Sequence, residues 1–448
     1  MGLLFLFLFA IAEIALVVLT ATKFAETAKW LTNRWIIRAA ETVLLLGMVL
    51  LPTTHMKWRF FATLLVLGIR LLIALIAYLA KRKSASGTKK MAGVIVSCVL
   101  SVLLVAAALV PSFLFTNYNG LKTTGAYEVK ETAAILVDES RVDPFETDGS
   151  FREVPAHFYY PAAEGEFPLI IFSHGAFGYY QSNFSTYAEL ASNGYVVVSL
   201  DHPHHAFFTK DTAGKLITVD PEFINGAMAI GSGDTVNDEQ VYEITQSWMQ
   251  LRTDDGNFVI DSIKAAKASN ALDAAWHAED EQTLLAVLAT TDTGKIGYMG
   301  HSLGGATGVA LGRLRDDLSA VVDIDGTALG EVVGIENDRR VPDDRPYPIP
   351  VLILSQQVDY DELPPDAAYV DVNKNLVENA KDGRLVSFVG AGHMDFTDLP
   401  LFSPFLASLL GTGTVNSEEC LCTMNALILN WFNYYLKNEG TLSIQAQY

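Results

Sequence analysis

Apolar residues are concentrated in the first quarter of the chain, in four nearly uninterrupted stretches. A helix needs about 20 consecutive apolar residues to cross a bilayer, and the second of these stretches is the shortest. The pattern predicts an all-α bundle of about four transmembrane helices over residues 1–116. We expect the first stretch to be a retained helix, because it lacks a basic leader and a small-residue cleavage site. The stretches are Leu3–Thr20, Ile36–Leu51, Phe60–Ala80 and Met91–Phe115.

After residue 116 the pattern changes to short apolar runs separated by amphipathic segments. Unbroken apolar runs are typical of parallel strands covered on both faces, and strands that alternate with helices indicate a doubly wound α/β domain. We therefore expect such a domain over residues 117–448. The predicted strands are 154–160, 169–172, 195–200, 296–299, 320–324, 351–354 and 385–389, and the predicted helices include 242–268, 306–314 and 425–436.

Charge divides along the same boundary. Residues 1–119 contain 12 Lys and Arg and three Asp and Glu, whereas the rest of the chain has 19 basic and 48 acidic side chains. So acidic a domain is repelled by nucleic acid, which we therefore exclude as a partner. The loops that follow the first and third spans are the richest in Lys and Arg, so the positive-inside rule places them in the cytoplasm. The protein is thus expected in the cell membrane with its large domain on the extracellular face.

Two charges lie inside the predicted spans. Glu13 and Arg70 are each ten residues into helices that run in the same direction, so both lie about 15 Å from the outer edge of the membrane. Charges at such a depth usually pair or line a cavity. We expect an interhelical Glu13–Arg70 pair, the alternative being that each side chain reaches the interface separately.

The three cysteines constrain the fold little. Cys98 falls within the fourth span, and Cys420 and Cys422 lie in the external domain. The last two form either a strained local disulfide or two free thiols.

The most informative motif is Gly300-His-Ser-Leu-Gly-Gly305, which contains the pattern G-x-S-x-G. It lies between the apolar run 295–299 and the small-residue run 306–310, which is the context of a strand, a sharp turn and a helix. Such a turn exposes a serine hydroxyl at the carboxyl end of a sheet, and its glycines avoid collisions with neighbouring backbone. Ser302 is therefore the candidate nucleophile.

A serine needs a base, usually a histidine that a carboxylate orients. In α/β-hydrolases the acid and then the histidine follow the serine along the chain, and His393 is the only histidine after Ser302. The acid is either Asp325, at the end of strand 320–324, or Asp359, after strand 351–354. Asp323 alternates to the other side of its strand and is expected to be structural.

The oxyanion of an acyl-transfer intermediate needs preorganised backbone N–H groups. Leu303, directly after the serine, is one candidate donor. Ala176, in the glycine-containing loop 172–178, is the other. Asp201-His-Pro-His-His205 has no additional ligand cluster that would complete a metal site, so we expect no metal, and these histidines are predicted to line the site or stabilise a turn. The segment 206–293 contains Phe207, Phe208, Phe223 and Trp248, and is a candidate cap over the pocket.

Together, Phe172-Ser-His-Gly-Ala176, Ser199-Leu-Asp-His-Pro203, Gly300–Gly305 and Gly392-His393 resemble the platelet-activating-factor acetylhydrolase family. They are also similar to the bacterial cutinase-like polyester hydrolases. The resemblance covers about residues 150–437, excludes the membrane bundle and implies an α/β-hydrolase fold. The acetylhydrolase branch implies Asp325 as the acid, whereas the cutinase-like branch implies the later strand and Asp359. The stretch 327–330 departs from the acetylhydrolase pattern.

These features predict a membrane-anchored serine ester hydrolase, with Ser302, Asp325 and His393 as the triad and Ala176 and Leu303 as oxyanion donors. Its substrate would be an ester or lipid, and no cofactor is expected. One rival is an acyltransferase that uses the same triad. Another is a non-catalytic receptor or assembly protein on a hydrolase scaffold, and a third gives the bundle its own transport role.

Overall fold

The computed structural model describes residues 1–22, 26–81, 83, 85–232, 236–337, 339–356 and 368–448. The chain divides into two compact units. The first comprises Met1–Asn119 and Pro400–Leu409, and the second comprises Gly120–Leu399 and Leu410–Tyr448.

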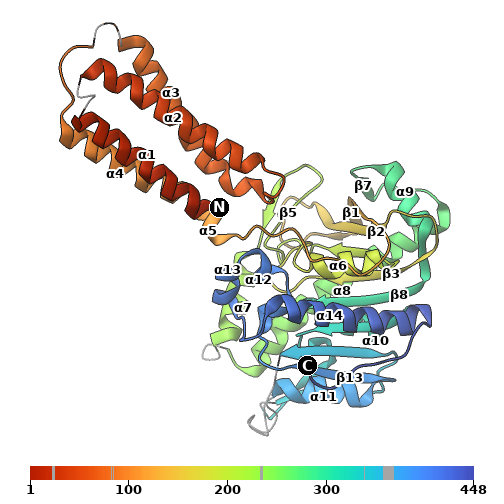
Figure 1. Cartoon of the computed structure of the whole chain (residues 1–448). Helices are drawn as coiled ribbons and strands as arrows, with labels where there is room; N and C mark the ends of the chain where they lie inside the picture. The colour runs from red at the N-terminus through yellow and green to blue at the C-terminus, as the bar shows by residue number, and fades with distance from the viewer. Residues whose placement is uncertain (23–25, 82, 84, 233–235, 338, 357–367) are drawn as a thin grey trace. The chain divides into compact units, whose positions relative to one another are not determined.

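The first unit is a helical bundle (Figure 1). Helices α1 and α3 each pack against both α2 and α4, and phenylalanine, leucine and valine side chains fill the space between them. Many aliphatic side chains face outward instead, such as Leu65 and Leu103, which are 66% and 60% exposed. The helices are α1 (Gly2–Thr22), α2 (Thr27–Leu50), α3 (Phe61–Lys81), α4 (Met91–Ala108) and the short α5 (Val110–Leu114), with a 3-10 turn η1 (Lys57–Phe60) before α3.

Three helical segments of the described chain are long and apolar enough to cross a membrane: Gly2–Thr22, Lys57–Lys81 and Met91–Ala108. The second apolar stretch of the sequence also forms a helix, α2, but it is not among the three. Four charged residues interrupt the apolar pattern of α2: Lys29, Arg34, Arg38 and Glu41. The sequence predicted about four spans, and the stretch that is not among the three segments is the one predicted to be the shortest.

The predicted Glu13–Arg70 ion pair is present within a larger buried cluster. The Glu13 carboxylate, 1% exposed, accepts hydrogen bonds from both Arg70 on α3 and Arg38 on α2. Arg38 also donates to Glu41 at 2.9 Å, and Arg70 Nη1 lies 3.5 Å from Glu41 Oε2. Two carboxylates and two guanidinium groups thus balance one another between three helices, as buried charges generally require.

The second unit is built on a nine-stranded sheet in the order β13-β12-β9-β8-β3-β4-β2-β1-β7. The six strands from β13 to β4 are parallel, whereas β2, β1 and β7 are antiparallel to their neighbours. The strands are β1 (Val129–Val142), β2 (Phe151–Pro161), β3 (Phe167–Ser173), β4 (Val196–Leu200), β7 (Trp276–Ala278), β8 (Thr291–His301), β9 (Leu318–Ile324), β12 (Val351–Gln356) and β13 (Gly383–Phe388). Two small hairpins, β5 (Phe208–Lys210) with β6 (Leu216–Thr218) and β10 (Val332–Glu336) with β11 (Arg339–Pro342), lie outside this sheet.

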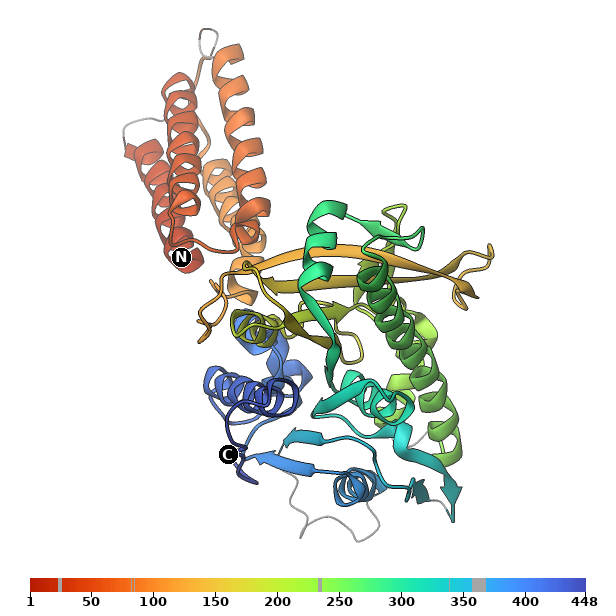
Figure 2. The same ribbon diagram turned by 90° about the vertical axis from the view of Figure 1, so that its right-hand side faces the viewer.

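Helices cover both faces of the sheet (Figure 2). Adjacent residues of β8 point to opposite faces: Gly297 faces Phe432 at the end of α14, and Tyr298 packs on Gly256 of α8 and Gly308 of α10. The predicted doubly wound α/β-hydrolase fold is therefore confirmed. The helices of this unit are α6 (Phe184–Ser192), α7 (Pro221–Ser232), α8 (Asp238–Ser269), α9 (Glu281–Thr290), α10 (Leu303–Leu314), α11 (Ala368–Asn379), α12 (Leu399–Phe402), α13 (Pro404–Leu410) and α14 (Ser417–Phe432), with short turns η2 (Leu329–Glu331), η3 (His393–Phe396) and a π-helical η4 (Asn433–Lys437); residues 400–409 of α12 and α13 are grouped with the first unit.

Cys420 and Cys422 are free thiols in α14, the first buried and the second exposed. Residues two apart on a helix do not face each other, which is why these two side chains point in different directions.

Candidate active site

Ser302 occupies the turn between β8 and α10. Its backbone has φ 55° and ψ −123°, a combination that a residue with a side chain rarely adopts. The flanking glycines make this turn possible: a Cβ on Gly300 would lie 2.2 Å from the Gly304 carbonyl carbon, and one on Gly304 would lie 1.9 Å from the Ser173 oxygen. Strain of this kind costs of order 1–3 kcal/mol and is typical of functional sites.

Asp325 and His393 are in direct contact. His393 Nδ1 lies 2.6 Å from Asp325 Oδ2, and the other carboxylate oxygen accepts a hydrogen bond from the Gln356 N–H at 2.7 Å. Asp325 directly follows β9 in a left-handed conformation, φ 53°, with its carboxylate buried. The carboxylate thus fixes the orientation of the imidazole, whose Nδ1 donates to it. Asp359, the alternative acid, lies outside the described residues.

The loop of His393 follows β13 and is held by a second carboxylate. Asp395 Oδ2 accepts hydrogen bonds from the Gly392 and Gly413 N–H groups at 2.9 and 2.6 Å. The His393 side chain is 36% exposed, as a base that meets a substrate needs to be.

His301 connects the serine turn to His393. The rings of His301 and His393 lie 4.5 Å apart, and His301 Nε2 lies 3.2 Å from the His393 carbonyl oxygen. Within the described chain, Ser302 Oγ forms no hydrogen bond with His393. Such bonds are often long without substrate and tighten in the reacting complex.

The two predicted oxyanion donors lie close together beside the serine. Ala176 belongs to the loop after β3 and packs in the same apolar cluster as Leu303, the first residue of α10. Neither N–H has a hydrogen-bond partner among the residues that the structure describes. Gly175 brings the loop close to the nucleophile, since a Cβ there would lie 3.1 Å from Ser302 Cβ.

The direction of the Ala176 N–H is set by the peptide that precedes it. In a trans peptide the carbonyl of Gly175 and the N–H of Ala176 point in opposite directions. Three donors hold that carbonyl oxygen: His174 Nδ1 at 2.7 Å, the Gly178 N–H at 3.1 Å and Arg252 Nη2 at 3.5 Å. Arg252 Nη1 also donates to the His174 carbonyl at 2.6 Å. These hydrogen bonds hold the Gly175–Ala176 peptide in place and therefore fix the direction of the Ala176 N–H.

Arg252 belongs to a buried polar network on α8. Asp255, one turn further along, accepts from Arg152 at 2.8 Å and lies 2.9 Å from His202 Nδ1. Burial opposes ionisation of Asp255, but the Arg152 charge and the bond from His202 outweigh it and lower the pKa of this carboxyl. This network was not predicted from the sequence. The sequence feature that indicates it is the pair Arg252 and Asp255. These two charged residues are three apart, on the helical face that also carries the buried Met249 and Val259.

The histidines of the segment 201–205 support the oxyanion loop. The His202 N–H donates to His174 Nε2 at 3.1 Å, and His202 Nε2 lies 2.9 Å from Ser173 Oγ. Burial lowers the pKa of His202 to about 4 and also lowers the pKa of His174 well below its usual value, so both rings are neutral at pH 7. His205 accepts a hydrogen bond at Nδ1 from Arg252 Nε at 3.2 Å.

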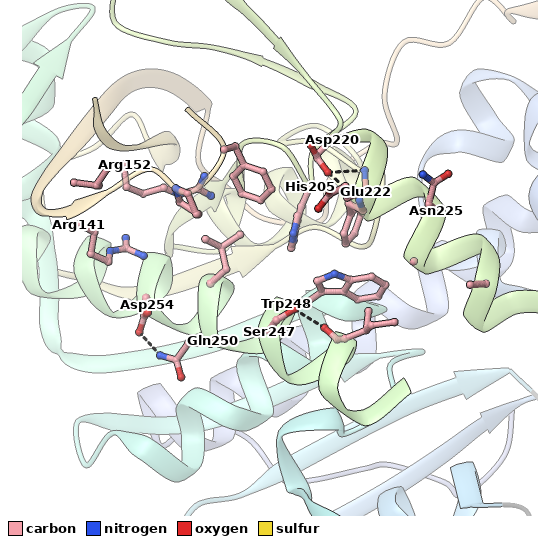
Figure 3. Close-up of a pocket in the computed structure, with 18 residues that line it drawn as sticks. Arg141, Arg152, His205, Asp220, Glu222, Asn225, Ser247, Trp248, Gln250 and Asp254 are labelled. Carbon is pink, nitrogen blue, oxygen red and sulfur yellow. Dashed lines mark hydrogen bonds between the residues drawn. The ribbon is translucent and has the colours of Figure 1, made fainter. Parts of the chain in front are cut away.

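A cavity of about 900 Å³ lies beside these residues (Figure 3). Its walls come from the β1–β2 connection, His205, α7 and α8, and they include Phe223 and Trp248 from the predicted cap. Those two residues also pack in the cluster that contains Ala176 and Leu303. Ser302, Asp325 and His393 do not line the cavity.

Comparison with known proteins places this architecture among ester hydrolases. Residues 154–441 match the family model of platelet-activating factor acetylhydrolase, isoform II. Chlorophyllase-1 of Arabidopsis thaliana is 22% identical over 343 residues, 72% of this chain and 88% of the relative. The platelet-activating factor acetylhydrolase of Canis lupus familiaris is 27% identical over 160 residues, 34% of each chain.

A solved structure of a ferulic acid esterase from Streptomyces cinnamoneus shares the fold, with a TM-score of 0.54 and 19% identity over 72% of this chain and 95% of the esterase. The family model spans well over half of the chain. The chain therefore belongs to the platelet-activating factor acetylhydrolase, isoform II, family, and is a hydrolase of the esterase or acetylhydrolase type.

Proposed function

We propose that the protein is a membrane-anchored serine carboxylic ester hydrolase whose triad is Ser302, His393 and Asp325. The observation that carries this proposal is the 2.6 Å contact between His393 Nδ1 and Asp325 Oδ2, made beside a serine in a strained turn. Asp325 holds the imidazole in the tautomer that leaves Nε2 free to accept a proton.

In the proposed reaction His393 takes the proton of the Ser302 hydroxyl as the oxygen attacks the ester carbonyl. The carbonyl oxygen becomes an oxyanion, which the N–H groups of Ala176 and Leu303 stabilise. The C–O bond to the alcohol then breaks, and His393 gives its proton to the departing oxygen. Water attacks the acyl-enzyme with His393 again as base, which releases the acid and restores Ser302.

Lipid esters are the substrate class that membrane anchoring favours. Three described helices have the length and composition to span a bilayer, and the acetylhydrolase relative is named for platelet-activating factor. We propose that the bundle anchors the hydrolase at the membrane surface, where amphiphilic esters are concentrated.

The test is labelling of the full-length protein in detergent with a fluorophosphonate, which reacts with activated serines. Wild type should be labelled, and Ser302→Ala and His393→Ala should lose at least about 99% of the labelling rate. His277→Ala is a matched control, because His277 is an exposed histidine on β7, and should label normally. A folded wild type that does not react, or reacts equally in Ser302→Ala, refutes the assignment.

A further inference from the structure

The cavity beside the oxyanion loop has the composition of a ligand site. Its volume of about 900 Å³ lies within the range of small-molecule pockets. One wall is aromatic: the Phe223 ring stacks on His205 at 3.9 Å and meets the Trp248 ring at 4.6 Å. Phe145 contributes a further ring from the β1–β2 connection. Such a lining favours a ligand with a flat or bulky apolar body.

One buried group in this wall is a hydrogen-bond donor that has no acceptor among the described residues. His205 is 2% exposed, and burial lowers its pKa far below the usual value, so the ring is neutral. Arg252 Nε donates to Nδ1 at 3.2 Å. Since an arginine only donates, this bond makes Nδ1 the acceptor and places the proton on Nε2.

The proton on Nε2 is directed at the cavity. No described residue accepts a hydrogen bond from Nε2, and the protein does not fully enclose this atom. Its open side is therefore the cavity that His205 lines, and Figure 3 shows the ring pointing toward Trp248. A buried N–H of this kind favours a ligand that offers an oxygen acceptor.

The charges of the cavity exclude anions. The guanidinium groups of Arg141 and Arg152 are each paired with two carboxylates, which neutralise their positive charge. The acidic residues in the wall, Asp220, Glu222 and Asp254, form no ion pair within the described chain. The local field is therefore negative, and it disfavours carboxylates and phosphates.

We propose that this cavity is a second binding site, separate from the nucleophile, for an uncharged amphiphile with an aromatic or bulky apolar body and a carbonyl oxygen. The carbonyl accepts the His205 Nε2 proton, and the body packs against Phe223 and Trp248. The site does not depend on the chemistry of Ser302, which does not line it.

Photolabelling with benzophenone tests the site directly. Benzophenone is uncharged, has two rings and one carbonyl, and on irradiation inserts into nearby C–H bonds without losing an atom. In the full-length protein in detergent we expect saturable labelling on peptides from α7 and α8. 4-Benzoylbenzoate has the same body with a carboxylate added, and should label these peptides at least about tenfold less well.

Two variants identify the donor and the cavity. His205→Phe keeps a ring against Phe223 but removes the N–H, and should weaken benzophenone binding about fivefold to tenfold, the equivalent of one hydrogen bond. Ile244→Trp places a larger side chain in the cavity and should reduce the labelling, even if His205→Phe fails to fold. His277→Phe, an exposed control, should bind like wild type.

Prior reaction with fluorophosphonate distinguishes the site from the active centre. Labelling of α7 and α8 should persist after Ser302 is blocked. Equal labelling by the anionic probe, labelling that Ile244→Trp leaves unchanged, or labelling that disappears when Ser302 is blocked would each overturn the proposal. None of these results would bear on whether Ser302 is the nucleophile.

Discussion

Asp325 is the residue on which the triad assignment depends most. Its side chain accepts one hydrogen bond from His393 Nδ1 and one from the Gln356 N–H. Asparagine keeps the shape but can donate to Nδ1, which favours the wrong imidazole tautomer. We expect Asp325→Asn to lower kcat about 10³–10⁴-fold, measured in steady-state ester hydrolysis.

Asp359→Asn is the control that separates the two candidate acids. It should leave kcat within about twofold of wild type if Asp325 alone orients His393. The reverse pattern, a large loss in Asp359→Asn and a small loss in Asp325→Asn, would transfer the role of acid to Asp359.

Arg252 acts at the residue scale as a positioning residue. It touches the carbonyls of His174 and Gly175 and so helps to aim the Ala176 N–H. Loss of an oxyanion donor costs about 10²–10³ in kcat, and a misdirected donor should cost less. We expect Arg252→Lys to lower kcat about 10–100-fold while KM changes less than about threefold. The reason is that the hydrogen bond from the Ala176 N–H to the oxyanion forms mainly in the transition state.

Arg152→Lys is a matched control in the same buried network. Arg152 is fully buried and paired with Asp255, but it forms no hydrogen bond with His174 or Gly175. The Arg152→Lys substitution should lower the melting temperature without a comparable loss of kcat. Equal kcat losses in both variants would mean that Arg252 acts through stability alone.

Asp201 makes the free energy of unfolding depend on pH. Burial raises its pKa to about 7, above the ordinary value near 3.9. Between about pH 4 and 7 the folded protein therefore binds more protons than the unfolded chain, and the free energy of unfolding falls as pH rises. The fall is at most about 1.4 kcal/mol per pH unit. Asp201→Asn should flatten this part of the stability curve, measured by chemical denaturation from pH 4 to pH 8, and an unchanged slope contradicts the assignment.

At the element scale, sequence patterns predicted the strands that carry the site and the edge strand β13, and they missed β1 and β7 at the opposite edge of the sheet. The strands before Ala176, Ser302 and Asp325 are nearly continuous apolar runs because both of their faces are covered. β1 escaped notice because its buried positions are Thr132, Ala134, Leu136 and Asp138, a series with no hydrophobic alternation. Its polar residues are stabilised by tertiary contacts, such as that of Arg141 with Asp255, which no local pattern reveals.

The same limit applies to the site. Local spacing and chain order were enough to select Ser302, His393 and the region of the acid, because a nucleophile turn has strict steric requirements. Arg252 could not be selected in this way. Its role depends on the carbonyls of a loop nearly 80 residues earlier in the chain, which only the fold brings close.

The charge cluster joins three helices of the bundle into one element. Removing one partner leaves a buried charge and typically costs about 3–5 kcal/mol. We expect Glu13→Gln and Arg70→Met each to destabilise the bundle, and the double variant to be less destabilised than the sum of the two by at least about 1 kcal/mol. Thermal unfolding in detergent measures the cycle, with Glu26→Gln, an exposed carboxylate, as the control. Strict additivity would show that the two side chains do not interact energetically.

At the scale of the whole molecule, the charge asymmetry along the chain bears on its orientation. The basic loops belong to the bundle, and the second unit is strongly acidic. Positively charged loops stay in the cytoplasm, so we propose that the hydrolase lies outside the cell. Cys422 offers a natural probe, because it is an exposed thiol in α14, whereas Cys420 is buried and Cys98 lies in α4.

A membrane-impermeant maleimide applied to intact cells should therefore label the wild type, and Cys422→Ser should lose the signal. Lys83→Cys in a Cys422→Ser background places a thiol in the loop between α3 and α4, and should react only after the cells are permeabilised. Because the two thiols lie on opposite sides of the same bilayer in the proposed topology, each serves as the control for the other. The inverse result, with the loop labelled in intact cells and Cys422 protected, would place the hydrolase in the cytoplasm and restrict its substrates to esters of the inner leaflet.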